Sequence, residues 1–307
     1  MWFGRTRLES GPGLNPDAAI VIGPGRLGLS LAGALAKHGR MRRVAVVGHG
    51  PERPGFLTSH DAVEYESAAT CHALWAESPA TPLGLVFAVD DDGLAAAAAE
   101  WAKRLADHSV SGPLVALHTS GFHTAAVLEP LDRIEGASIG GWHPLIAVAQ
   151  PDADVFEGVT VGIEGEPAAV TWADEISRAL GALPVPIPAG EKARYHAAAV
   201  FASNYLVASL GVALAELEAV SGGAVDESAL LPLARAAIDN VAEHGISAGA
   251  TGPLVRGDVH TVTGHLAALD PARASLYRAL GRELLDLVRQ RNSPEVYAAL
   301  RAALSED

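Results

Sequence analysis

Residues 18–28 read Ala18-Ala19-Ile20-Val21-Ile22-Gly23-Pro24-Gly25-Arg26-Leu27-Gly28, and this stretch decides the fold. Its first half is apolar, as in a buried strand, its second half has the pattern Gly-x-Gly-x-x-Gly, and a helix is predicted over residues 29–37. The first glycine permits a tight turn, the second lets the backbone approach a pyrophosphate, and the third lets helix and strand pack closely. Free N–H groups and the positive dipole end of the helix favour phosphate. The stretch predicts a dinucleotide site formed by Gly23, Gly25, Arg26, Leu27 and Gly28; the alternative is an ordinary strand-to-helix turn.

The composition is that of a soluble globular protein with room for two domains. The chain has 307 residues, of which 49% are hydrophobic and 19% charged. Its formal charge is −14, from 22 basic and 36 acidic residues, and it contains no run of lysine or arginine. Nucleic acids and anionic membranes favour a basic surface, so the sequence predicts neither as a partner.

The cysteine count and the apolar segments bear on the compartment. Cys71 is the sole cysteine, which excludes an intrachain disulfide and fits a reducing compartment. Residues 1–17 are expected to form a flexible tail rather than a signal peptide. Residues 197–217 contain one charge, Glu216, but their serines, asparagine and alanines favour a buried helix in a bundle over a membrane span. We therefore predict a cytoplasmic protein.

Strand and helix patterns alternate along the first half of the chain. Strands are predicted over 43–48, 83–89, 114–118, 138–142, 159–163 and 185–187, and helices over 94–106 and 168–180. This alternation predicts a parallel, doubly wound sheet. Beyond residue 188 only helical periodicity is found, over 190–220, 227–244, 259–269, 271–291 and 295–304. The predicted organisation is a tail over 1–17, an α/β Rossmann-type dinucleotide-binding domain over 18–188 and an all-α substrate and dimerisation domain over 189–307, with the active site in the cleft between the two domains.

The end of the second predicted strand bears on the choice of cofactor. An acidic residue there would accept hydrogen bonds from the ribose hydroxyls of NAD, but the sequence continues His49-Gly50 with Arg53 close behind. His49 and Arg53 would instead face the 2′-phosphate of NADP, so NADP is favoured and NAD stays possible. The alternative is that His49 and Arg53 are surface loop residues without a role in cofactor binding. Val89, at the end of the strand over 83–89, completes the predicted cofactor-binding set.

Polar side chains also follow two other predicted strands. His118 and Ser120 lie at the carboxyl end of one strand, and His143 follows another. Ligands of open α/β sheets collect at this edge, so these residues are predicted to line a substrate pocket. The alternative is that both histidines are structural.

The helix that opens at Lys192 holds the main catalytic candidates. Lys192, His196 and Ser203 fall on one narrow helical face, with Asn204 further round. A lysine beside an apolar helix would protonate, or hydrogen-bond to, a carbonyl oxygen that gains negative charge; otherwise it extends into solvent.

A loop further along, over residues 251–258, carries Arg256, which would clamp a substrate carboxylate. Asp258 is expected to cap the following helix. His260 and His265 are five residues apart, a spacing that does not place them on one metal-binding helical face, and no metal is assigned.

These motifs together resemble one family. They are the glycine loop, the turn over 118–121, the segment over 142–145, the helix over 192–204 and the loop over 251–258. The family is the Rossmann-like one with a C-terminal domain of unknown function, DUF2520, in the superfamily of 6-phosphogluconate dehydrogenase, pyrroline-5-carboxylate reductase and ketopantoate reductase. The resemblance runs from about Ala18 to about Tyr277.

The resemblance implies a dinucleotide-binding domain and a helical domain that supplies a catalytic lysine and a dimer interface. In relatives similar to ketopantoate reductase, a lysine opens a long helix and an asparagine follows; Lys192 and Asn204 match in kind. Their spacing departs from the usual four residues, since His196 stands at that position. The segment that starts at His143 also resembles the His-Pro-Met segment of prephenate dehydrogenases.

The sequence therefore predicts an NAD(P)-dependent oxidoreductase, active as a homodimer. The expected reaction is reduction of a small 2-oxo acid, such as ketopantoate, with NADPH. Lys192 would act as acid or oxyanion partner, His196 would orient it or relay protons, and Arg256 would bind the carboxylate. The alternatives are a prephenate-like dehydrogenase or imine reductase on the same scaffold, and a non-catalytic dinucleotide sensor.

Overall fold

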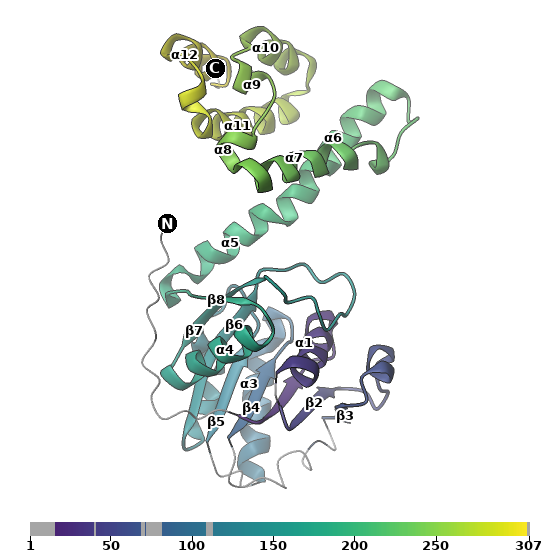
Figure 1. The fold of residues 1–307 in the computed structure, drawn as a ribbon, viewed down its shortest axis with the longest axis vertical. Coiled ribbons are helices and arrows are strands. Elements are labelled where there is room, and N and C mark those ends of the chain that lie inside the picture. Colours follow the sequence, from purple (N-terminus) through teal and green to yellow (C-terminus); the bar gives the residue numbers. More distant parts are fainter. Residues whose placement is uncertain (1–15, 40, 69–70, 72–81, 109–112, 306–307) are drawn as a thin grey trace. The chain divides into compact units, whose positions relative to one another are not determined.

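The computed structural model describes residues 16–39, 41–68, 71, 82–108 and 113–305 (Figure 1). The chain divides into two compact units, Met1–Tyr205 and Leu206–Asp307, each considered by itself below. The helix that starts at Lys192 thus belongs to the first unit, whereas the sequence analysis assigns it to the helical domain. The tail predicted over 1–17 lies outside the described residues except for Pro16 and Asp17.

The first unit is built on an eight-stranded sheet in the order β3-β2-β1-β4-β5-β6-β7-β8. The strands are β1 (Ala18–Ile22), β2 (Arg43–Gly48), β3 (Val63–Ser67), β4 (Leu83–Phe87), β5 (Leu114–His118), β6 (Ala137–Pro144), β7 (Thr160–Gly165) and β8 (Leu183–Pro186). The chain reverses its direction of travel across the sheet between β1 and β4, which places the ligand crevice of such folds beyond the carboxyl ends of these two strands.

Helices cover both faces of this sheet. On one face α1 (Arg26–His38) and α4 (Pro167–Ala179) bury Leu31, Leu35 and Trp172 against the strands. On the other face α3 (Asp91–Asp107) and the 3₁₀ helix η2 (Ala125–Arg133) do the same with other apolar side chains, Leu94, Trp101 and Leu128 among them. The predicted doubly wound α/β fold is confirmed.

The sheet differs from the prediction at β7, which runs antiparallel to β6 while the other neighbouring pairs are parallel. The connection over residues 145–159 is therefore not a helical crossover. It contacts α1 instead, where Asp152 N donates to Ser30 Oγ over 2.9 Å and Lys37 pairs with Asp154.

Two helices follow β8 in the chain, α5 (Lys192–Ala202) and α6 (Asn204–Ser221). The prediction of one continuous helix over 190–220 is wrong, because Ser203 leaves helical geometry with φ −121° and ψ −72°. The prediction that residues 197–217 are buried is also wrong: no residue of α6 is buried within the single chain. Within the described residues one helical stretch, Ala189–Ser221, is long and apolar enough to cross a membrane.

The α-helices that follow α6 in the second unit range from 4 to 17 residues in length, and side chains cap the later ones. They are α7 (Leu231–His244), α8 (Ile246–Gly249), α9 (Pro253–Arg256), α10 (Val259–Ala268), α11 (Pro271–Leu287) and α12 (Pro294–Ala303). Asp258 caps α10 by accepting from Thr261 N, as expected, and Asp270 and Ser293 cap α11 and α12 in the same way. Leu254, Val262, Leu285, Leu300 and Leu304 form the core of this unit.

Candidate functional site

The three glycines after β1 have three different environments. Gly23 has φ +110°, and a Cβ there would lie 2.5 Å from the carbonyl oxygen of Ala88. A Cβ on Gly28 would collide with the carbonyl oxygen of Gly23. A Cβ on Gly25 would meet nothing within 4 Å. The first and third glycines are therefore required by packing, whereas the second faces open space.

The start of α1 leaves backbone donors free beside that space. Gly25 is the N-cap and makes no side-chain capping bond, and the first turn carries no acidic residue. The first backbone bond of the helix runs from Leu29 N to Gly25 O, over 2.9 Å. The N–H groups of Arg26, Leu27 and Gly28 thus precede the helical ladder, where a helix favours an anion. An open glycine beside uncapped donors fits a phosphate group.

The loop after β2 carries no carboxylate at its start. β2 ends at Gly48, and the next side chain, His49, is exposed. Nη2 of Arg53 donates to three carbonyl oxygens, those of Leu57, His60 and Val63. One arm of this guanidinium therefore shapes the loop. Val89, the last predicted cofactor-binding residue, lies against the first glycine of the loop, with its Cγ1 3.1 Å from where a Cβ on Gly23 would stand.

Lys192 is a buried ionisable group of the first unit. It opens α5 and is 2% exposed, and its Nζ donates to the carbonyl oxygen of Ser120 over 2.9 Å. Burial lowers the pKa of the Lys192 amine, while the carboxylates of Glu164 and Asp91 act against this shift. A buried amine with a lowered pKa loses its proton more readily than a surface lysine, which suits an acid.

His118 lies beneath the same turn. Its Nδ1 accepts a hydrogen bond from Ser120 N over 3.1 Å, so the proton of the neutral ring is on Nε2. Burial lowers the pKa of His118, which keeps the ring neutral. Its Nε2 faces Oε1 of Glu164 at 3.6 Å. The backbone of Ser120 is thus bonded on both sides: its N–H donates to His118, and its carbonyl oxygen accepts from Lys192.

His143 and His196 flank the next residue of that turn. A Cβ on Gly121 would lie 2.7 Å from the ring of His196 and 2.8 Å from that of His143, so only glycine lets both rings approach. Oη of Tyr195 lies 3.0 Å from His143 Nδ1, donates to the carbonyl oxygen of His143 and accepts from Gly162 N. Burial and the nearby Lys192 charge lower the pKa of His143 to about 4.

The structure therefore brings together five of the predicted site residues of the first unit. The five are His118, Ser120, His143, Lys192 and His196. Asn204 is exposed at the start of α6, where its Oδ1 accepts from Ser203. Arg256 ends α9 in the second unit.

Sequence reasoning missed Glu164 and Tyr195. Tyr195 stands between Lys192 and His196 in a helix already singled out, so its place in the cluster could have been found. Glu164 has no such signal, because its position depends on which strand pairs with β6 and in which register.

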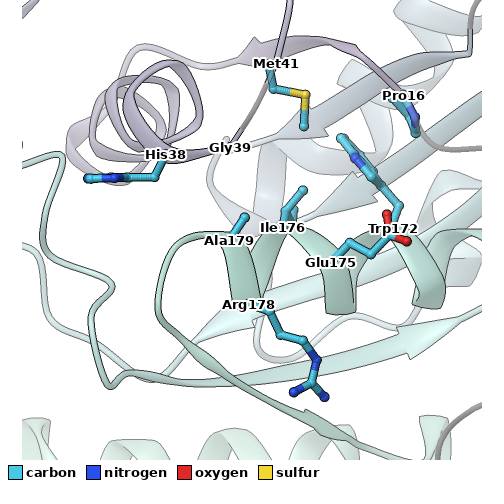
Figure 2. A pocket seen from close by; sticks show the side chains of 9 residues that line it. All are labelled: Pro16, His38, Gly39, Met41, Trp172, Glu175, Ile176, Arg178 and Ala179. Atoms are coloured by element: carbon cyan, nitrogen blue, oxygen red, sulfur yellow. The ribbon is translucent and has the colours of Figure 1, made fainter.

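A cavity of about 660 Å³ lies away from these residues, between the end of α1 and α4 (Figure 2). Pro16, His38, Trp172 and Arg178 are among its lining residues. His38 is the last residue of α1, whereas the glycine loop over 23–28 (the glycine cradle) lies at the start of this helix. The cavity is therefore about 20 Å from the glycine cradle along the helix axis. This cavity is therefore separate from the candidate site.

Comparisons with known proteins agree with the fold. Residues 159–284 match the family model described as a domain of unknown function, DUF2520. The structure resembles that of protein TM1727 from Thermotoga maritima, with a TM-score of 0.66 and 19% identity over 89% of this chain and 98% of that one. It also resembles a Bacteroides fragilis protein described as an NADP oxidoreductase, with a TM-score of 0.61 and 22% identity over 89% and 100% of the chains.

A pyrroline-5-carboxylate reductase from Coxiella burnetii aligns with a TM-score of 0.51 and 14% identity over 94% of this chain and 98% of that one. The sequence has no significant match among curated proteins. At these identities the structural likeness establishes the fold. The chain therefore has a Rossmann-type fold, and its residues 159–284 are similar to the DUF2520 family.

Proposed function

We propose that the protein is an NAD(P)-dependent oxidoreductase that reduces a small 2-oxo acid, of which ketopantoate is the first candidate, with NADPH. The observation that carries this proposal is a buried lysine, 2% exposed, whose amine is held on the turn after β5 in a sheet that also carries an open glycine cradle. Burying a lysine is costly, and an active site is where such a cost is repaid by chemistry.

The cofactor, when bound, supplies a hydride to the carbonyl carbon of the substrate. Lys192 donates a proton to the carbonyl oxygen as negative charge develops there, which gives the alcohol, and the neutral amine regains its proton from solvent. His118, Ser120 and His143 line the pocket, and His196 orients the amine. Arg256 binds the carboxylate of the substrate.

NADPH is the proposed cofactor because the two residues directly after β2, His49 and Gly50, carry no carboxylate. An acid at that point would bind the ribose hydroxyls of NAD and repel a 2′-phosphate. His49 is exposed at the end of this strand, and Arg53 is exposed with its Nη2 already fixed to the loop. The resemblance to a protein described as an NADP oxidoreductase supports the same choice.

We also propose a cytoplasmic homodimer that pairs through α6 and its neighbours. Phe201, Val207 and Val220 are 67%, 68% and 83% exposed, which is costly for a monomer in water. Glu216 on α6 forms an ion pair with Arg273 over 3.4 Å, and Ser209 also interrupts the apolar surface. These polar groups favour a second protein copy over a lipid bilayer as the occupant of this surface.

Replacement of Lys192 by methionine tests the catalytic role, because methionine keeps the length and loses the amine. We expect kcat/KM to fall at least about 100-fold, the scale of a lost general acid, with NADPH affinity unchanged. Lys103→Met is the matched control, since Lys103 is exposed on α3. The assay follows NADPH consumption against a panel of 2-oxo acids, a prephenate-like substrate and cyclic imines.

The same panel separates the alternatives. Turnover of the prephenate-like compound or an imine alone would assign the other reductase or dehydrogenase activity on this scaffold. Tight nucleotide binding without turnover of any compound would identify a dinucleotide sensor and refute the proposed catalysis. A Lys192→Met variant within a few-fold of the wild-type kcat/KM would refute the role of the lysine.

A further inference from the structure

Glu164, which the proposed reaction does not yet use, lies in one row with His118 across three strands. His118 on β5 pairs with Gly141 on β6, and Gly141 pairs with Glu164 on β7. Residues in register on neighbouring strands point to the same face, so the two side chains flank a glycine. A Cβ on Gly141 would lie 2.9 Å from Oε1 of Glu164 and 3.2 Å from the His118 ring. The missing side chain of Gly141 is what lets the carboxylate and the imidazole meet.

This contact is almost completely closed to water. The His118 side chain is 0% exposed and that of Glu164 is 5% exposed. Their facing atoms, Nε2 and Oε1, are 3.6 Å apart and have no hydrogen-bond partner among the described residues, so each is the nearest group of opposite character for the other. Because Nδ1 of His118 accepts from Ser120 N, the Nε2 proton points at the carboxylate. The carboxylate thus favours the one tautomer in which His118 can hold the turn.

The carboxylate also affects the charge of Lys192. The groups that act on the amine are Glu164 from β7 and Asp91 from the start of α3. His143 on β6 and His118 on β5 are neutral neighbours of the amine, and His196 faces His143 from the following turn of α5. Of the two acids, Glu164 is the buried one and has the larger effect on the amine.

We propose that Glu164 is a positioning residue of this site, which orients His118 and thereby the Ser120 turn, and whose negative charge keeps the buried Lys192 amine protonated. This inference rests on the proposed role of Lys192 as proton donor. Without a carboxylate at this point, burial would leave the amine neutral over a wider pH range and unable to donate.

The small number of lysines makes the charge of this amine measurable. The sequence contains three lysines, Lys37, Lys103 and Lys192, so a protein labelled with ¹³C-lysine gives three side-chain signals, and Lys192→Met identifies one of them. In Glu164→Gln we expect the Lys192 signal to titrate about one pH unit lower than in the wild type, with the other two unchanged. Glu164→Asp, which keeps the charge, should restore most of the difference. Glu135→Gln, at an exposed position, should change nothing.

If Glu164→Gln does not fold, Gly141→Ala gives the same test, because its Cβ displaces the carboxylate without removing it. An unchanged Lys192 midpoint in whichever variant folds would overturn the proposal. The pH profile of NADPH-dependent turnover provides the second measurement: its alkaline limb should move to lower pH by the same amount, which a merely structural effect would not produce.

The two measurements distinguish this inference from the proposed function. If the titration midpoint of Lys192 falls in Glu164→Gln but no substrate is turned over, the proposed reductase activity is refuted. The effect of the Glu164 charge on the Lys192 amine is then still supported. If turnover depends on Lys192 but the alkaline limb of its pH profile is unchanged in Glu164→Gln, only the positioning role of Glu164 is refuted.

Discussion

The glycine loop allows phosphate binding and folding to be perturbed separately. At Gly25 the backbone has φ −71° and ψ 175°, which alanine adopts without strain, and its Cβ would meet no atom within 4 Å. Gly25→Ala should therefore leave the fold intact and stabilise it by about 0.4–1 kcal/mol, because alanine restricts the unfolded chain. At Gly28 the added Cβ collides with the Gly23 carbonyl, so Gly28→Ala should cost about 1–3 kcal/mol.

Gly25→Ala, which should leave the fold intact, should nevertheless weaken NADPH binding. A phosphate oxygen bonded to the first N–H groups of α1 would lie about 2.9 Å from them, in the space that a Cβ on Gly25 would fill. We expect Gly25→Ala to weaken NADPH binding at least about tenfold, or 1.4 kcal/mol. Urea denaturation measures the stability of both variants, and a fluorescence titration with NADPH measures affinity. Wild-type affinity in Gly25→Ala, at wild-type stability, would show that no phosphate approaches this glycine.

Two further predictions concern stability and assembly. Burial lowers the pKa of His143 from 6.5 to about 4, so between these values the unfolded chain binds more protons and stability falls with falling pH. The wild type should lose about 2 kcal/mol more than His143→Gln between pH 7 and pH 5 in urea denaturation, and equal losses would contradict the burial of a neutral ring. A charge at the exposed position 207 of α6, in Val207→Glu, should convert the proposed dimer to a monomer in light scattering while the chain stays folded. A wild-type protein that is monomeric, or that requires detergent to stay in solution, would exclude the proposed pairing.

Strong local signals made much of the fold predictable. β2 and β5 have the predicted bounds, since each contains four consecutive apolar residues. Helix starts at Asp258, Asp270 and Ser293 follow from residues that accept backbone N–H groups. The turn after β5 was also predictable as a polar segment at the ligand edge, because a parallel sheet places all its carboxyl ends together.

The features that were not predicted depend on tertiary contacts. β3 was missed because it alternates polar and apolar residues at the edge of the sheet, where half of its surface meets solvent. The direction of β7 and its register with β6 are set by pairing rather than by local sequence, so Glu164 could not be placed. The exposure of α6 was misjudged because an apolar helix has the same sequence whether its own chain or another molecule covers it.

The reversed strand β7 has a consequence for how this scaffold diversifies. An ordinary crossover would pass behind the sheet, but here the chain over residues 145–159 leaves the strand that bears His143 and reaches the flank of α1. One continuous surface segment thus touches both the helix that opens the glycine cradle and the strand that bears a site histidine. Insertions or exchanges confined to this segment would alter the surroundings of α1 and of the strand that bears His143, while the hydrogen-bonded framework of the sheet persists. Natural variation in substrate choice among proteins of this architecture should therefore concentrate in the length and composition of this segment.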